Sequence, residues 1–173
     1  MGDRYHTAIH EAGHAVIGRK VTMVCGGATI KADDDLDAAG HAIVADADTT
    51  WRAWEMREKF RDLTSVMRGR IITIQAGHEA EAEILGEPLT GDDDDRECAE
   101  AMVEDAGFPE DQDAVVLARL RRFARQLARR HRADIERVAA ALMERETLTG
   151  EEIDAMLPPG FMARPETWAL AVG

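Results

Sequence analysis

Hydrophobic residues near the start of the chain recur at the three- and four-residue steps of one helix face. The recurring positions are Ala8, Ile9, Ala12, Val16 and Ile17. Asp3 is a good N-cap residue, so we expect the helix to begin after it. The Gly26-Gly27 pair predicts where the helical segment stops.

Two short segments after this helix have the composition of β-strands. ATIKA (28–32) and GHAIVA (40–45) each predict a short strand, and the polar run DDDLD (33–37) between them suits a turn. We therefore expect a small β-hairpin directly after the first helix.

Most of the remaining chain has helical spacing. The predicted helices span residues 50–70, 71–85, 93–106 and a stripe from 114 to 142. Thr149 and Glu152 have the spacing of a capping box, which predicts the start of a last short helix. The pattern as a whole predicts a mainly α fold, with one domain over residues 1–157 and a C-terminal tail over 158–173.

The first predicted helix carries the motif HEAGH at residues 10–14. Residues four apart lie on one helix face, so His10 and His14 can reach one metal ion through their ring nitrogens. Glu11 is turned about 100° from His10, beside the metal, where it can accept a proton from an activated water. A metallopeptidase zinc site is the function that this spacing indicates. The alternative is an exposed helix with two chance histidines, and the apolar residues around the motif disfavour it.

Gly13 lies inside the same motif. A glycine within a helix costs up to about 1 kcal/mol relative to alanine. That cost predicts a close approach of another backbone, either beside the metal face or through tight helix packing.

Four segments together resemble the FtsH family of ATP-dependent, membrane-anchored zinc metallopeptidases. TAIHEAGHAVIG (7–18) resembles the family's zinc helix, and AGHEAEAEILGE (76–87) is similar to its second signature. TGDDDDRECAEAM (90–102) resembles the stretch that carries an aspartate zinc ligand, and LMERETLTGEEIDAML (142–157) resembles the end of the peptidase domain. The resemblance implies a helical FtsH-peptidase-like domain with a small β-hairpin after the HExxH helix.

The resemblance also implies a third zinc ligand. In the family pattern an alanine follows the liganding aspartate by four residues, and Asp95 with Ala99 fits that register. Asp94 is the alternative, because the run of four aspartates makes a slip of one residue easy. Two histidines, one aspartate and a water would leave the open position that a catalytic zinc needs.

The segment 76–87 contains one more candidate site residue and two positions that differ from the family pattern. Glu81 matches a family glutamate that could accept the free N–H of a zinc-bound histidine; an ordinary surface glutamate is the alternative. His78 stands where the family has arginine, and Ala82 replaces the family's second glutamate. These departures put in doubt any role of those two side chains, but not the metal site.

Other polar residues have two interpretations each. Tyr5, His6 and His41 could contact the substrate or its oxyanion, or be surface residues. The seven arginines between Arg119 and Arg132 could bind a phosphate backbone or an acidic partner. Because most of them lie opposite the apolar stripe, a solvated helix face is the better interpretation.

Composition limits the classes of partner. The 173 residues carry a net charge of −13, which disfavours nucleic acids and anionic membranes as partners. No apolar run approaches the roughly 18 residues of a transmembrane helix, and the first residues lack the pattern of a signal peptide. The two cysteines form no C-x-x-C pair. We therefore expect a cytoplasmic protein.

The sequence contains no G-x-x-x-x-G-K-[ST] phosphate loop. The resemblance therefore implies zinc binding and peptide hydrolysis, but not ATP-driven unfolding or membrane anchoring. The function that we predict is that of a zinc-dependent endopeptidase acting on extended or unfolded polypeptide, with or without a separate ATPase partner. The alternatives are a regulatory HExxH protease specific for one partner and a zinc-stabilised binding module without turnover.

Overall fold

The computed structural model describes residues 2–32, 40–44, 49–50, 52, 63–86, 93–105 and 112–162. In chain order its elements are α1 (Gly2–Lys20), β1 (Cys25–Thr29), β2 (His41–Val44), α3 (Leu63–Ile84), α4 (Asp93–Asp105), α5 (Asp113–Arg130), α6 (Arg132–Arg145), β3 (Thr147–Thr149) and α7 (Gly150–Met156). Helices dominate, and a small antiparallel sheet accompanies them. The predicted mainly α fold is confirmed.

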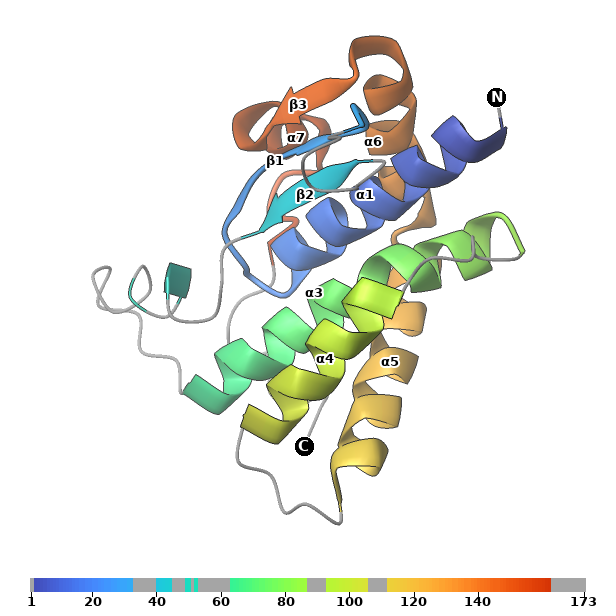
Figure 1. Ribbon diagram of the computed structural model, residues 1–173. Coiled ribbons are helices and arrows are strands. Elements are labelled where there is room, and N and C mark those ends of the chain that lie inside the picture. The colour runs from blue at the N-terminus through green and yellow to red at the C-terminus, as the bar shows by residue number, and fades with distance from the viewer. Residues whose placement is uncertain are drawn as a thin grey trace.

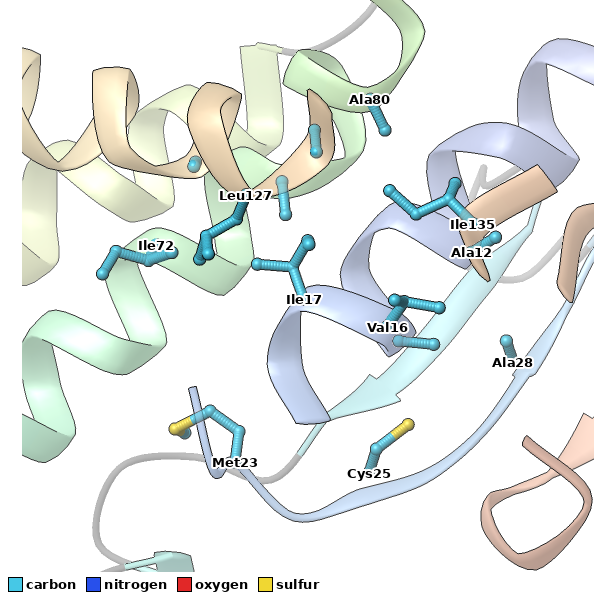
Figure 2. Close-up of a cluster of buried hydrophobic side chains, with 14 of the residues drawn as sticks. Ala12, Val16, Ile17, Met23, Cys25, Ala28, Ile72, Ala80, Leu127 and Ile135 are labelled. Atoms are coloured by element: carbon cyan, nitrogen blue, oxygen red, sulfur yellow. The ribbon is translucent and has the colours of Figure 1, made fainter. Parts of the chain in front are cut away.

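Helix α1 lies at the centre of the molecule, between the sheet on one side and helices α3 to α5 on the other (Figure 1). Its small and branched residues are completely buried: Ala8, Ile9, Ala12, Ala15, Val16 and Ile17. Figure 2 shows Val16 and Ile17 of this helix among side chains of the other layers, including Ile72, Leu127 and Ile135. A helix buried on nearly every side is held by packing rather than by its intrinsic propensity.

The ends of α1 differ from the prediction. The helix begins at Gly2 rather than after Asp3, and it ends at Lys20 rather than at the glycine pair, which lies in β1. Thr22 ends it by adopting a φ of 65°, and the Met23 N–H donates to the Gly18 carbonyl oxygen at 2.8 Å. A β-branched residue is rare in this left-handed region, so the sequence pattern could not indicate the stop.

The sheet has the strand order β2-β1-β3, with antiparallel pairing on both sides of β1. The predicted hairpin is confirmed, although its first strand spans 25–29 rather than 28–32. Strand β3 was not predicted, because its three residues directly precede the last helix. The predicted turn at 33–37 lies outside the described residues. Strand β1 is therefore internal, and β2 lies at one edge of the sheet.

Two predicted helix boundaries are wrong. Residues 63–84 form one helix, α3, so there is no break at 70 and 71; most of the predicted helix at 50–70 lies outside the described residues. The apolar stripe that predicted one helix over residues 114–142 belongs to two helices, because His131 leaves the helical conformation at φ −106° and ψ 21°. The apolar positions of α5 and α6 are in phase across His131, which made the two helices look like one.

Helix α4 agrees with its predicted range to one residue. The capping box at the start of α7 is confirmed, since the Thr149 Oγ1 accepts from the Glu152 N–H at 3.3 Å and the Thr149 N–H donates to Glu152 Oε2 at 2.8 Å. At the start of the predicted tail, Phe161 is buried and its carbonyl oxygen accepts from Lys20 Nζ. The division into a domain and a tail stays a prediction.

Within the described ranges, none of the helices combines the length and the apolar character of a membrane span.

Candidate metal centre

Helix α1 brings the two histidines of the motif onto one face. Their rings stand edge to face with centroids 4.5 Å apart, and the His10 and His14 Nε2 atoms are 2.9 Å apart. Because the helix is enclosed by packing, both side chains are fixed in direction by its position.

Asp95, the third residue of α4, reaches the same point. Its Oδ2 lies 3.3 Å from His10 Nε2 and 3.1 Å from His14 Nε2. The three side chains form a group whose ligand atoms lie within 4.8 Å of one another. The neighbouring Asp94 is exposed. Of the two aspartates that the sequence left open, the structure brings Asp95 to the histidines.

Hydrogen bonds on the far side of each ring fix its proton. His14 Nδ1 lies 2.7 Å from the carbonyl oxygen of Thr73, which can only accept, so the proton is on Nδ1. His10 Nδ1 donates in the same way to Glu81 Oε1 at 2.8 Å. When these rings are neutral, as metal binding requires, the lone pair is therefore on Nε2, facing the other ring and Asp95.

This donor set fits a zinc ion. Two imidazole lone pairs and a carboxylate oxygen within about 3 Å of one another repel unless a cation lies between them. The Asp95 Oδ2 atom is buried and has no hydrogen-bond partner among the described residues. Two neutral imidazoles and one carboxylate are a common zinc ligand set that leaves a position open.

The charges around the rings favour a cation. Burial alone lowers the pKa of His10, but the nearby carboxylates of Asp95 and Glu81 outweigh it and raise that pKa to about 10. Burial alone raises the pKa of Asp95, but His14 and His10 outweigh it and hold that pKa well below its usual range. The centre therefore attracts positive charge, whether a proton or a metal ion.

Glu11 is buried beside this group, with 5% of its surface exposed. Its Oε2 atom has no hydrogen-bond partner among the described residues, and burial raises its pKa above that of an ordinary glutamate. A buried carboxylate with a raised pKa and a free oxygen is suited to accept and return a proton.

Gly77 on α3 lies directly against the two rings. A Cβ atom there would be 2.5 Å from His14 Nε2 and 2.7 Å from His10 Nε2. Any side chain at this position would occupy the space where the two nitrogens converge. Gly13 meets α3 in the same way, since its Cβ would lie 2.8 Å from the Ala76 carbonyl oxygen. This is the close backbone approach that the sequence predicted for Gly13.

The remaining site residues proposed from the sequence are Glu81, His6, Tyr5 and His41. Glu81 is 3% exposed, so it is not a surface glutamate. His6 lies with its Nδ1 4.0 Å from Glu81 Oε2, and Tyr5 is half-buried. A charge on His41 would lower the pKa of Glu11, which indicates that His41 is near enough to act on it electrostatically. Sequence reasoning missed the Thr73 carbonyl, which has no side-chain signature.

The arginine run is neither a free binding surface nor only a solvated face. Arg121 and Arg125 each donate to the fully buried Glu79 at 2.5 Å, and Arg129 donates to both carboxylate oxygens of Glu83 at 2.9 and 3.0 Å. These ion pairs join α5 to α3. Arg121, Arg125 and Arg129 are therefore paired with carboxylates of the same protein.

Comparison with known proteins identifies three relatives, although no protein-family model matches the chain. The chain is 32% identical, over 90% of its length, to "ATP-dependent zinc metalloprotease FtsH 1" of Symbiobacterium thermophilum. It is 29% identical over 91% to "ATP-dependent zinc metalloprotease FtsH 2" of Sphaerobacter thermophilus, and 26% identical over 96% to "ATP-dependent zinc metalloprotease FtsH 3" of Sorangium cellulosum. The chain spans 29%, 27% and 31% of these relatives, respectively.

Replacing each of the two neighbouring aspartates with alanine tests the third ligand. Asp95→Ala removes a ligand atom, so we expect zinc affinity to fall by more than the roughly 10–100-fold that follows loss of a residue that only hydrogen-bonds to a ligand. The matched change Asp94→Ala should leave about one zinc per chain, measured by metal analysis after dialysis against a weak chelator. Full zinc content in Asp95→Ala would remove this residue from the site, and loss in Asp94→Ala alone would shift the ligand by one residue.

Gly77→Ala tests the geometry of the rings. The added methyl group should lower zinc affinity by at least about 10–100-fold, although alanine is the better helix former. Gly26→Ala is the control, because the atoms that its methyl group would meet first belong to Ile43, the nearest at 3.1 Å. Zinc titration and thermal unfolding of both variants give the result. Native zinc affinity in Gly77→Ala would contradict the described approach of α3 to the histidines.

Proposed function

Because this chain is a distant relative of the FtsH zinc metalloproteases, we propose that it is a zinc-dependent endopeptidase. Its substrates are peptide bonds in extended or unfolded polypeptide, and it needs no ATP hydrolysis of its own. The observation that carries this proposal is the convergence of His10, His14 and Asp95 beside the buried Glu11. A structural zinc site would need no buried proton acceptor next to it.

The chain's own residues perform distinct tasks in this reaction. His10, His14 and Asp95 would hold zinc, while Glu81 and the Thr73 carbonyl keep both Nε2 lone pairs directed at it. When bound, zinc supplies a Lewis acid that acidifies water and polarises a peptide carbonyl. Glu11 accepts the proton of the attacking water and then delivers it to the leaving amine, so that the peptide bond breaks without a free amide anion.

The edge strand β2 is suited to hold an extended substrate. A Cβ at Gly40 would lie 2.8 Å from Thr7 Cγ2, and a Cβ at Gly18 would lie 3.8 Å from Val44 Cγ1. Strand β2 therefore runs alongside the part of α1 between Thr7 and Gly18, which contains Glu11 and His14. An extended peptide that pairs with this edge would pass beside the proposed catalytic residue.

The direction of backbone groups in β1 identifies which N–H groups of β2 point away from β1. The Ile30 N–H donates to the Glu146 carbonyl oxygen on the β3 side, whereas the Thr29 carbonyl oxygen points toward Gly40 on the β2 side. Backbone groups alternate in direction along an antiparallel ladder, and Thr29 pairs with His41. Of His41, Ala42 and Ile43, it is therefore Ala42 whose N–H is directed away from β1.

Two alternatives remain distinguishable from this proposal. A regulatory protease specific for one partner would cut that partner but leave a generic unfolded substrate such as casein intact. A zinc-stabilised binding module would lose stability on zinc removal without having cut any peptide. Glu11 favours an enzyme, since a binding module gains nothing from a buried carboxylate whose Oε2 has no hydrogen-bond partner among the described residues.

A Glu11→Gln variant tests the proposed general base. Replacing Glu11 with Gln keeps the size of the side chain but removes the proton acceptor. We expect near-native zinc content and thermal stability, and hydrolysis of unfolded substrate reduced by a factor on the order of 10² or more. Equal cleavage rates for the two zinc-loaded proteins would exclude Glu11 as the general base.

A proline in β2 tests the proposed substrate edge. Ala42→Pro removes the outward N–H of the edge strand, so KM for peptides should rise about tenfold while zinc content and melting temperature change little. Thr29→Pro is the contrasting variant; it removes a donor from the internal strand and should lower the melting temperature itself. Unchanged KM in a folded Ala42→Pro protein would show that β2 does not hold the substrate.

A further inference from the structure

A hollow of about 510 Å³ lies on α5, where this helix borders Glu79 of α3. Its residues on α5 are three and four positions apart, so they follow one face of the helix: Ala114, Val115, Ala118, Arg121, Arg122 and Arg125. We call these six residues the α5 surface. At a rise of 1.5 Å per residue, it is about 15 Å long from Val115 to Arg125. Helix α5 lies on the opposite side of α1 from the sheet (Figure 1).

The first half of the α5 surface is apolar. The side chain of Val115 is 65% exposed, the highest value for a large hydrophobic residue within the described ranges. Ala114 and Ala118 are exposed beside it. Apolar area that stays in water is unfavourable and gains free energy when a partner covers it. This end of the surface therefore offers a contact for one apolar side chain.

The second half is basic, and its arginines are held in place. Arg121 and Arg125 donate through Nε to Glu79, whose side chain is 1% exposed, whereas their own side chains are 44% and 49% exposed. Each guanidinium group has further N–H donors on its Nη atoms, and none of these donates to another described residue. Because Glu79 fixes both groups, a second carboxylate can pair with them at a small cost in side-chain entropy.

The charges at this hollow leave a positive excess. Arg122 is exposed and has no ion-pair partner within the described part of the chain. Three arginines and one glutamate give a net charge of +2, in a protein whose net charge is −13. An acidic segment of about 15 Å would stay within this positive area. A nucleic acid would extend beyond it and meet the acidic remainder of the protein, which disfavours that class of partner.

We propose that the α5 surface is a docking site for a short acidic segment of another protein. An apolar side chain of the segment packs on Val115, and its carboxylates pair with Arg121, Arg122 and Arg125. Glu79 faces α5, whereas Gly77 and Glu81 of the same helix face α1 and the histidines. A protein that is bound here therefore leaves the candidate metal centre and the edge strand β2 accessible.

Two variants of exposed residues test the two halves of the surface without touching the Glu79 pairs. Arg122→Glu reverses a charge, and Val115→Ser removes the apolar contact. Arg130→Glu is the matched control for charge, because Arg130 is exposed on the same helix but does not line the hollow. The probe is a fluorescein-labelled Leu-Asp-Glu-Asp-Glu peptide. One control peptide has lysine in place of each acidic residue, and the other has serine in place of leucine.

Binding to the full chain is measured by fluorescence anisotropy, and melting temperatures confirm that each variant is folded. Wild-type protein should bind the acidic peptide saturably, and more weakly as salt is added. Its affinity should fall about tenfold or more in Arg122→Glu and about threefold or more in Val115→Ser, but stay within about twofold in Arg130→Glu. The two control peptides should bind at least about threefold more weakly than the probe.

Several results would overturn the proposal. These are no binding by the wild type, native affinity in folded Arg122→Glu or Val115→Ser, and an equal loss in Arg130→Glu, which would show an effect of overall charge only. Equal affinity for a single-stranded RNA would make the surface a nucleic-acid site instead. A salt-sensitive dimer of the unliganded protein that Arg122→Glu abolishes, seen by sedimentation, would assign the surface to a second copy of the chain.

Discussion

The close contact between α1 and α3 is the constraint on which the candidate site depends. Gly13 meets the backbone of α3, and Gly77 meets the two histidine rings. Each glycine costs a helix up to about 1 kcal/mol relative to alanine. Their absent side chains let the two helices approach until Thr73 and Glu81 reach the far nitrogens of His14 and His10. The same contact thus packs the core and fixes the tautomers of the rings.

Helix α3 links the different parts of the site. One face carries Gly77 and Glu81 toward α1, and another places His78 in the wall of a cavity between α3, α4 and α5. A third position, Glu79, is fully buried and held by Arg121 and Arg125 of α5. A buried carboxylate is tolerable only with such charged partners. The position of α3 relative to α5 therefore affects the metal centre and this cavity together.

The sequence predicted most of what local spacing determines. The four-residue step of His10 and His14 and the capping box at Thr149 follow from helix geometry, so they could be identified directly. The choice of Asp95 came from the register of a family resemblance, because spacing alone does not distinguish it from Asp94. What could not be predicted depends on tertiary structure or on unusual backbone conformations: the left-handed Thr22, the break at His131 between two helices in phase, and the backbone carbonyl of Thr73.

The pairing of β1 with β3 has a consequence for the order in which the chain is made. Thr29 and Thr147 join through their hydroxyl groups although they are 118 positions apart. A chain that emerges from the ribosome N-terminus first can pair β1 with β2 early, but the other edge of β1 stays unpaired until β3 exists, and an unpaired edge is a site of aggregation. Once β3 has been made, β1 is paired on both sides, and β2 and β3 are the outer strands. The last strand to be synthesised thus turns β1 from an edge strand into an internal one.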